Sequence, residues 1–182
     1  MLEPAVSSIV DEVDNLNKLL VEFSEFTRLP NPHSEPVDMR QLIQEVIQVY
    51  ENLSSRVTFG CRFVNDSATI KVDRKQMKQV FANLFKNAIQ AMPDGGELSV
   101  ITDLVKKDDS PYFRVQVRDT GTGIEEEFKD NIFEPYFTTK KDGSGLGLSI
   151  VDRIIFDHNG SIWFETKKGR GTTFFIDLPM EN

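Results

Sequence analysis

Asn83-Leu-Phe-Lys-Asn87 places two amide side chains four residues apart in a helical pattern that is otherwise apolar on one face. Such polar groups on a packed helix cost free energy unless they are hydrogen-bonded or hold a ligand. Three glycine-bearing segments follow: Asp119-Thr-Gly-Thr-Gly-Ile124, Gly143-Ser-Gly-Leu-Gly147 and Gly169-Arg-Gly-Thr-Thr-Phe174. Clustered glycines let backbone N–H groups approach an anion closely. The four segments in this order predict a nucleotide site that takes ATP with a magnesium ion.

Composition restricts the class of protein. The 182 residues suit one domain, or one domain with an appendage, and the 39% hydrophobic and 27% charged content is typical of a soluble globular chain. A net charge of −8 argues against nucleic acid as a partner. The single Cys61 excludes an internal disulfide and favours a reducing compartment. Without an apolar run of about 18 residues or a signal peptide, we expect no membrane segment and a cytoplasmic location, although a longer parent protein can be membrane-anchored.

The first thirty residues carry a heptad pattern. Its apolar positions are Val6, Ile9, Val13, Leu16, Leu20 and Phe23. Because a lone helix cannot bury this stripe against itself, residues 1–30 are expected to form a helix that pairs with a second copy through residues 5–29, or with a helix absent from this chain. Packing on the chain's own globular unit is the alternative. Pro30 and Pro32 end the helix, and residues 31–36 are predicted to be a linker.

The remainder, residues 37–182, has the pattern of a second domain. We expect helices over residues 38–52, 74–92 and 146–158, with Asp38 and Asp73 as N-caps of the first two. Strands are expected over residues 57–64, 69–72, 97–105, 112–118, 161–166 and 172–178. The expected core face of the second helix comprises Met77, Val80, Phe81, Leu84, Ala88 and Ile89. Strands interleaved with helices, several in hairpins, predict an α+β two-layer sandwich.

The polar positions have chemical and ordinary interpretations. An Asn carbonyl oxygen suits magnesium beside phosphate oxygens, but Asn83 and Asn87 can equally be solvent-facing amides. Asp119 follows a strand, where a carboxylate can accept a hydrogen bond from an exocyclic adenine amine or simply begin a turn. Gly143, Gly145 and Gly147 precede a helix whose free N–H groups and dipole attract phosphate.

These segments resemble the motifs of sensor histidine kinases. Asn83–Asn87, Asp119–Gly123, Phe133-Glu-Pro-Tyr-Phe137, Gly143–Leu148 and Gly169–Thr172 look like the N, G1, F, G2 and G3 boxes of that family. The match covers about residues 37–179, and the superfamily includes gyrase, heat-shock chaperone and MutL ATPases. Glu22-Phe-Ser-Glu-Phe-Thr-Arg-Leu-Pro30 is similar to the end of the second dimerization helix in NtrY- or NtrB-like nitrogen-regulation kinases.

The resemblance implies a Bergerat-type ATP-binding fold, with an N-terminal dimerization helix and a catalytic domain over residues 37–182. Asn87 would coordinate magnesium, and Asn83 would support the ion or the phosphates. Asp119 would bind the adenine amine, with Gly121 and Gly123 shaping that wall and Thr173 acting through water.

The resemblance also implies a mobile lid over residues 133–144. The backbone at Gly143, Gly145, Leu146 and Gly147 would contact the phosphates. Lys140 or Lys141 would approach the phosphates as a point charge, with two solvated lysines as the alternative.

Position 83 distinguishes branches of the superfamily. Its hydrolytic members carry a Glu there as a general base, and the Asn83 amide cannot accept that proton. Transfer to a neutral imidazole needs mainly positioning and charge neutralisation, so a histidine kinase is favoured over an ATPase. A hydrolytic module of the superfamily and a regulatory module that sequesters a partner protein remain alternatives.

The acceptor histidine of such kinases has no match here. The chain has only His33, in the predicted linker, and His158, which ends a helix where a cationic cap is expected. The acceptor helix is therefore expected to be missing, so that the chain would not autophosphorylate alone. A response regulator is the expected partner through that missing phosphoacceptor domain.

Overall fold

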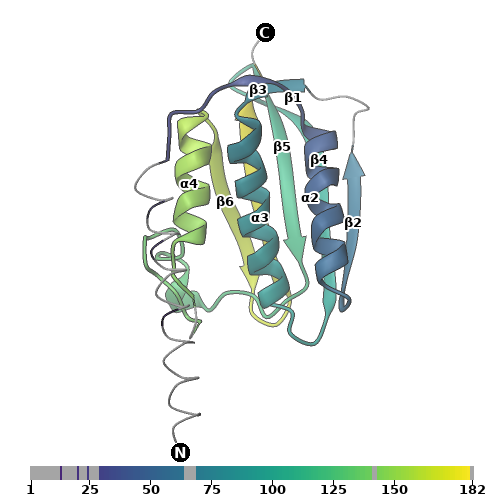
Figure 1. The fold of residues 1–182 in the computed structure, drawn as a ribbon, viewed down its shortest axis with the longest axis vertical. Coiled ribbons are helices and arrows are strands. Elements are labelled where there is room, and N and C mark those ends of the chain that lie inside the picture. Colours follow the sequence, from purple (N-terminus) through teal and green to yellow (C-terminus); the bar gives the residue numbers. More distant parts are fainter. Residues whose placement is uncertain are drawn as a thin grey trace, which may run out of the picture.

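A computed structural model describes Val13, Leu20, Ser24 and residues 29–63, 69–140 and 143–180. Their elements follow in the order β1 (Glu35–Asp38), α2 (Met39–Leu53), β2 (Val57–Phe63), β3 (Thr69–Val72), α3 (Arg74–Gln90), β4 (Gly96–Lys107), β5 (Ser110–Asp119), a 3-10 turn η1 (Glu126–Phe128), α4 (Gly147–Asp157), β6 (Ser161–Lys167) and β7 (Gly171–Pro179). One sheet has the strand order β2-β4-β5-β7-β6, and helices α2, α3 and α4 cover one of its faces (Figure 1). This arrangement confirms the predicted α+β two-layer sandwich.

The sheet is mixed. β2 runs parallel to β4, whereas β4–β5, β5–β7 and β6–β7 are antiparallel pairs. Side chains alternate across it, so that Phe113, Val115 and Val117 of β5 are buried on the helix side. β5 and β7 lie side by side, with Arg118 opposite Thr173. The ends of these two strands therefore bring the first and third glycine segments together.

Both predicted N-caps are confirmed. Asp38 Oδ1 accepts a hydrogen bond from Gln41 N at 3.1 Å, and Asp73 Oδ1 accepts one from Gln76 N at 3.0 Å. Each carboxylate satisfies a backbone donor that the first helical turn leaves free. α3 therefore begins where the sequence predicts, although it ends at Gln90, two residues early.

α3 is the central helix, with α2 and α4 on either side of it (Figure 1). The expected core face is buried except at Ile89, which is only partly buried, and Phe85 is fully buried although it was not expected there. The Phe85 ring makes edge contacts with Tyr50 of α2 and Phe59 of β2, at centroid distances of 5.8 and 6.3 Å. A helix with neighbours on both sides buries a wider stripe than one face supplies.

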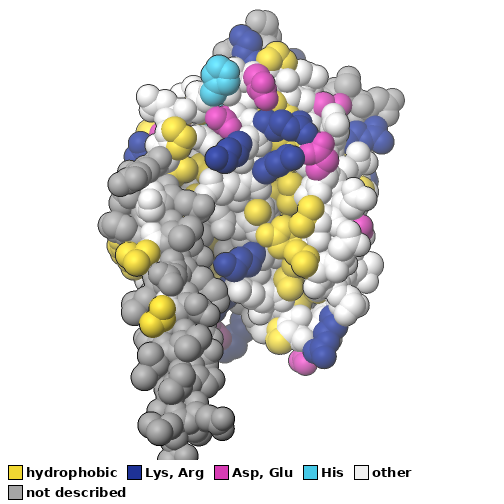
Figure 2. Space-filling view, in the orientation of Figure 1, with side chains coloured by type: hydrophobic (Ala, Val, Ile, Leu, Met, Phe, Trp, Pro, Cys, Tyr) yellow, Lys and Arg dark blue, Asp and Glu magenta, His cyan; other side chains and the backbone are white. Residues whose placement is uncertain are grey.

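The helix-bearing face mixes charges of both signs near one end, with exposed hydrophobic atoms along the middle (Figure 2). Glu45 of α2 bridges Arg74 and Lys78 of α3 at 2.6 and 2.8 Å. Because these side chains are all at least a third exposed, such pairs contribute little. Burial of apolar side chains holds α2 against α3.

The segment predicted as a linker is bonded to the domain. Pro30 O accepts from Gln76 Nε2 at 2.8 Å, and His33 N donates to Asp73 Oδ2 at 2.9 Å. β1 begins at Glu35, inside the predicted linker, and pairs antiparallel with β3. Most of the predicted dimerization helix lies outside the described residues. Val13 and Leu20, seven residues apart, have helical backbone and are 50% and 64% exposed.

His158 is buried between α3 and α4. Its Nδ1 lies 2.7 Å from the carbonyl oxygen of Ile154, while its Nε2 accepts from Asp73 N at 2.9 Å. A carbonyl only accepts, so Nδ1 carries the proton and the ring is neutral. The expected cap is present, but the expectation of a cation there is wrong, because Nε2 faces a donor. Both ring nitrogens are engaged, which argues against a role as phosphoacceptor.

A charged cluster lies on the sheet face opposite the helices. The fully buried Asp177 carboxylate receives Arg114 Nε at 2.7 Å and Arg114 Nη2 at 2.8 Å, and Lys107 Nζ lies 2.5 Å away. Trp163 stacks on Phe175 at 5.2 Å beside both cations. Burial raises the pKa of Asp177, but the bonds from Arg114 and Lys107 outweigh it and hold that pKa below its usual value.

Candidate functional site

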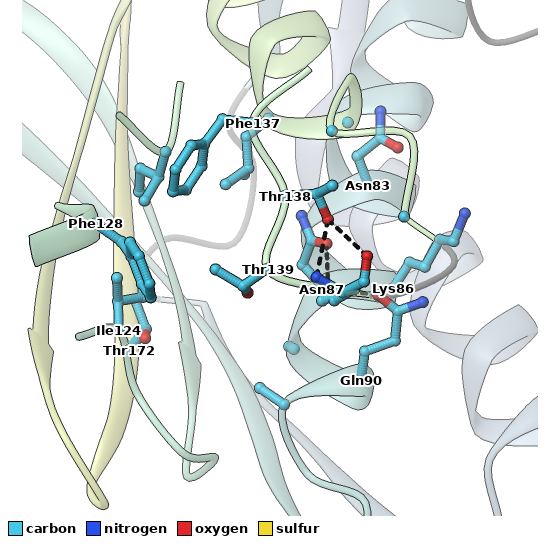
Figure 3. Close-up of a pocket in the computed structure, with 18 of the residues that line it drawn as sticks. Asn83, Lys86, Asn87, Gln90, Ile124, Phe128, Phe137, Thr138, Thr139 and Thr172 are labelled. Atoms are coloured by element: carbon cyan, nitrogen blue, oxygen red, sulfur yellow. Dashed lines mark hydrogen bonds between the residues drawn. The ribbon is translucent and has the colours of Figure 1, made fainter. Parts of the chain in front are cut away.

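A cavity of about 990 Å³ opens between α3, the start of α4 and the ends of β5 and β7. Figure 3 shows two unlike walls. Asn83, Lys86, Asn87 and Gln90 of α3 supply a polar wall, whereas Ile124, Phe128 and Thr172 lie on the opposite side. Mostly apolar lining with a few placed polar groups is typical of a small-molecule site.

The polar wall meets the second glycine segment at the start of α4. A Cβ added to Gly147 would lie 3.4 Å from Asn83 Oδ1 and 4.0 Å from Asn87 Nδ2. Glycine therefore lets the backbone of α4 approach the two amides closely. Gly143, Gly145 and Gly147 all line the cavity, whereas the Leu146 side chain is buried in the core. Any part that Leu146 takes in binding must therefore come from its backbone.

Asp119 lies at the end of β5, lines the cavity and is only 5% exposed. Its Oδ1 accepts from Gly121 N at 2.8 Å and from Thr172 N at 3.2 Å. Burial raises the pKa of Asp119, and these two backbone bonds lower it by less. Among the described residues both of its hydrogen bonds end on Oδ1, so Oδ2 of this cavity-lining side chain remains available as an acceptor.

The glycines after Asp119 are sites of close packing. A Cβ at Gly121 would lie 2.6 Å from Ala91 O, and one at Gly123, whose φ is +71°, would lie 2.5 Å from Lys167 O. Gly123 lines the cavity, whereas Gly121 packs against the end of α3. Gly123 is thus part of the wall near Asp119, whereas Gly121 acts only through its contact with the end of α3, and the part of both in adenine binding stays a prediction.

Thr172, not Thr173, lines the cavity. Alternate residues of β7 point to opposite faces, and the buried Phe174 shares the face of Thr172. Thr173 lies between them on the other face, so its expected approach to the adenine wall is not supported. A shift of one residue along a strand exchanges the faces, and the resemblance alone did not fix that register.

Sequence reasoning missed most of the apolar wall. Ile124, Phe128 and Ile132 line the cavity at a spacing of four residues, and the Phe128 ring lies 5.7 Å from that of Phe137. The segment that carries them contains only the short turn η1. Their four-residue spacing would suggest a helix face, but residues 124–132 form no α-helix, so the sequence carries no periodic signal that identifies this wall.

Lys140 lies beside the second glycine segment, where its carbonyl oxygen accepts from Gly143 N at 3.2 Å, and its side chain reaches the polar wall. Its Nζ donates to Asn87 Oδ1 at 3.0 Å and also to Gln90 Oε1. Desolvation by the surrounding protein lowers the pKa of Lys140, and the nearby Lys86 lowers it further. Lys141, the other expected phosphate contact, lies outside the described residues.

The donor set on α3 fits magnesium held together with phosphates. Two neutral amide oxygens, Asn87 Oδ1 and Gln90 Oε1, already accept a cation in the form of an ammonium. Magnesium commonly takes one or two protein oxygens and completes its shell with phosphates and waters. No group of three or more His, Cys, Asp or Glu side chains suited to a metal occurs among the described residues. The ligand would therefore have to bring part of the coordination shell.

Comparisons with known proteins agree with the motifs. Residues 72–182 match the family described as histidine kinase-, DNA gyrase B- and HSP90-like ATPase. The signal transduction histidine-protein kinase AtoS of Escherichia coli K12 is 33% identical over 177 residues, which cover 96% of this chain and 29% of AtoS. The nitrogen regulation protein NtrY of Azorhizobium caulinodans is 29% identical, covering 100% of this chain and 24% of NtrY.

The solved structures agree in fold. The catalytic domain of histidine kinase ThkA is 34% identical with a TM-score of 0.73, covering 81% of this chain and 96% of that domain. A structure of ThkA in complex with the response regulator TrrA is 29% identical with a TM-score of 0.78, covering 100% of this chain and 52% of ThkA.

The chain spans less than a third of the length of AtoS and NtrY. Within the part that the structure describes, no helix is long and apolar enough to cross a membrane.

Proposed function

The chain belongs to the family of histidine kinase-, DNA gyrase B- and HSP90-like ATPases, and we propose that it is the ATP-binding catalytic part of a cytoplasmic two-component sensor histidine kinase. Its task is to place the γ-phosphoryl group of ATP against a histidine on another helix. The observation that carries this proposal is the pairing of two unlike ends in one cavity. Asp119 offers a buried acceptor at one end, and Asn83 and Asn87 offer amides at the other.

The base end follows from Asp119. With Oδ1 fixed by Gly121 N and Thr172 N, Oδ2 accepts a hydrogen bond from the exocyclic amine of adenine. Ile124, Phe128 and Ile132 pack against the faces of the base. A carboxylate in this place selects adenine over a base that presents a carbonyl there, because two acceptors would repel.

The phosphate end follows from α3 and the glycine segment. The backbone at Gly143, Gly145 and Gly147, beside the start of α4, faces the phosphate oxygens. Asn87 would hold the magnesium ion, with Asn83 one turn earlier supporting ion or phosphates. When bound, magnesium neutralises phosphate charge and orients the transferred group. Because the Asn83 amide cannot take a proton from water, transfer to an imidazole is favoured over hydrolysis.

The acceptor and the partners extend this proposal. His158 is neutral, buried and bonded through both nitrogens, so it does not receive the phosphoryl group. The acceptor is a histidine on a separate helix, which would pack beside the homodimer that residues 5–29 are proposed to form. The phosphohistidine then supplies a response regulator.

Binding is tested by calorimetry with a nonhydrolysable ATP analogue and magnesium. We expect saturable binding to the purified chain that weakens when magnesium is chelated. Asn87→Ala should lose most of that magnesium effect, whereas Gln48→Ala on the exposed side of α2 should not. Absence of any affinity for adenine nucleotides would overturn the assignment.

Transfer is tested with γ-labelled ATP. The chain alone should acquire no acid-labile, base-stable label, and a supplied acceptor helix with a histidine should acquire it. Sustained phosphate release without any acceptor would instead identify a hydrolytic ATPase.

A further inference from the structure

Lys140 and Gln90 form a contact that the proposed chemistry does not use. We propose that Gln90 is a positioning residue that holds the Lys140 ammonium on Asn87 in the ligand-free domain, so that magnesium–nucleotide must displace this lysine to bind. The inference rests on the proposed function, because it takes Asn87 as the magnesium ligand. It adds a regulatory contact to that site, which we call the Lys140 latch.

The geometry of the latch is local to one helix face. Asn87 and Gln90 are three residues apart on α3, so their side chains leave the helix on neighbouring turns of one side (Figure 3). Lys140 Nζ donates to Asn87 Oδ1 at 3.0 Å and to Gln90 Oε1. Two acceptors thus fix one ammonium, and Gln90 supplies the only one of them that is not assigned to magnesium.

The chemistry of the acceptors makes the contact displaceable. Both oxygens belong to neutral amides, and Lys86 on the same helix face repels the ammonium. A carboxylate in place of Gln90 would hold the lysine as an ion pair, which is stronger than a bond to an amide. The amide pair therefore holds Lys140 while leaving it open to exchange for a competing cation.

Competition follows because one oxygen serves both cations. Asn87 Oδ1 cannot coordinate magnesium while the Lys140 ammonium lies against it, since two positive charges would then share one acceptor. The competent fraction of the domain is the fraction with Lys140 released, and the apparent affinity falls by that fraction. Once displaced, the ammonium lies beside the phosphates, where its charge is favourable. The Lys140 side chain thus has two positions, one on Asn87 and Gln90 without nucleotide and one beside the phosphates with it.

The latch itself is tested without nucleotide. The ligand-free protein is acetylated with limiting reagent, and the modification rate of Lys140 is read by mass spectrometry against the exposed Lys106 as internal reference. We expect Lys140 to react at least threefold faster in Gln90→Ala than in the wild type. Gln90→Glu should restore protection, and Gln48→Ala on the exposed side of α2 is the matched control. Equal Lys140 rates in wild type and Gln90→Ala would overturn the proposal.

The competition is tested by magnesium titration of ATP-analogue binding in calorimetry. Gln90→Ala should lower the half-saturating magnesium concentration about three- to tenfold, the size expected for losing one typical intramolecular hydrogen bond. In a Lys140→Met background the same substitution should have no further effect. An unchanged magnesium requirement in Gln90→Ala would refute the competition. If the wild type bound no nucleotide, the proposed function would fail, and acetylation would still decide whether the latch exists.

Discussion

Asp119 and Asp177 are both buried aspartates on neighbouring strands, yet their surroundings differ in every respect. Asp177 receives two cations on the sheet face away from the helices, and its pKa is lowered. Within the described part of the chain, Asp119 has only backbone donors, both on one oxygen, and burial raises its pKa. A buried carboxylate surrounded by cations is complete within the protein, whereas one with an acceptor left toward a cavity is prepared for a ligand. The difference separates a structural charge from a binding charge.

The largest effect is expected on the free energy of unfolding when Asp177, the carboxylate paired with two cations, is changed. Asp177→Ala leaves Arg114 and Lys107 without their common partner beside Trp163. Breaking a buried pair by removing one side is costly, so the free energy of unfolding should fall by about 3 kcal/mol. Urea denaturation measures this, and nucleotide affinity of the folded variant should stay within twofold of wild type. A large affinity loss without a stability loss would reverse the roles assigned to the two aspartates.

The next largest effect is expected on ATP affinity when Asp119 is changed. Asp119→Asn keeps an oxygen for Gly121 N and Thr172 N but turns an amide donor toward the adenine amine. Affinity for ATP should fall more than tenfold by calorimetry. Stability of the ligand-free protein should change by less than about 1 kcal/mol, because an unfavourable buried charge is removed along with charge-assisted bonds. Unchanged affinity would remove Asp119 from the site.

Lowering the pH should change the contributions of Asp177 and Asp119 to folding stability in opposite directions. The lowered pKa of Asp177 means that its stabilisation is present above the unfolded value of about 3.9 and is lost as pH falls through the folded value. The deficit of Asp177→Ala relative to wild type should therefore shrink on acidification. The raised pKa of Asp119 means that its charge destabilises the folded state as pH rises above about 3.9. The stability of Asp119→Asn relative to wild type should then increase with pH. Denaturation midpoints at several pH values check both, and parallel curves would contradict the contrast.

The smallest effect is expected at the outer cation of the cluster. Lys107 is 39% exposed, and Lys107→Met leaves the two Arg114 bonds to Asp177 in place. The loss should be below about 1 kcal/mol by thermal unfolding, as is usual for a partly exposed pair. A loss as large as that of Asp177→Ala would mean that Lys107, not Arg114, neutralises the carboxylate.

Local patterns predicted the parts of the fold that are local. The N-caps at Asp38 and Asp73, the start of α3 and the positions of most strands along the chain depend on neighbouring residues. β1 was missed because four residues carry no useful alternation, and their partner β3 lies more than thirty residues away. Phe85 was missed because its burial depends on Tyr50 and Phe59, which come from other elements.

The site divides in the same way. The sequence motifs selected Asn83, Asn87 and Asp119, and all three line one cavity. Thr172 lines the cavity in place of the predicted Thr173, because the register of β7 decides which of its side chains point to the cavity side. The contact of Lys140 with Gln90 joins residues fifty positions apart. No periodicity encodes such a contact, so only a structure reveals it.

The bonds from Pro30 and His33 to the first turn of α3 have a mechanical consequence. These two bonds fix residues 30 and 33 against the start of α3. A rotation of the segment that precedes them would therefore be passed on to the helix. It reaches Asp73 and Gln76 directly, and Asn83 lies only two helical turns beyond Gln76, about 10 Å along the axis. Helix α3, which carries Asn83 and Asn87, is thus also the element through which the entering segment can change the orientation of these two amides.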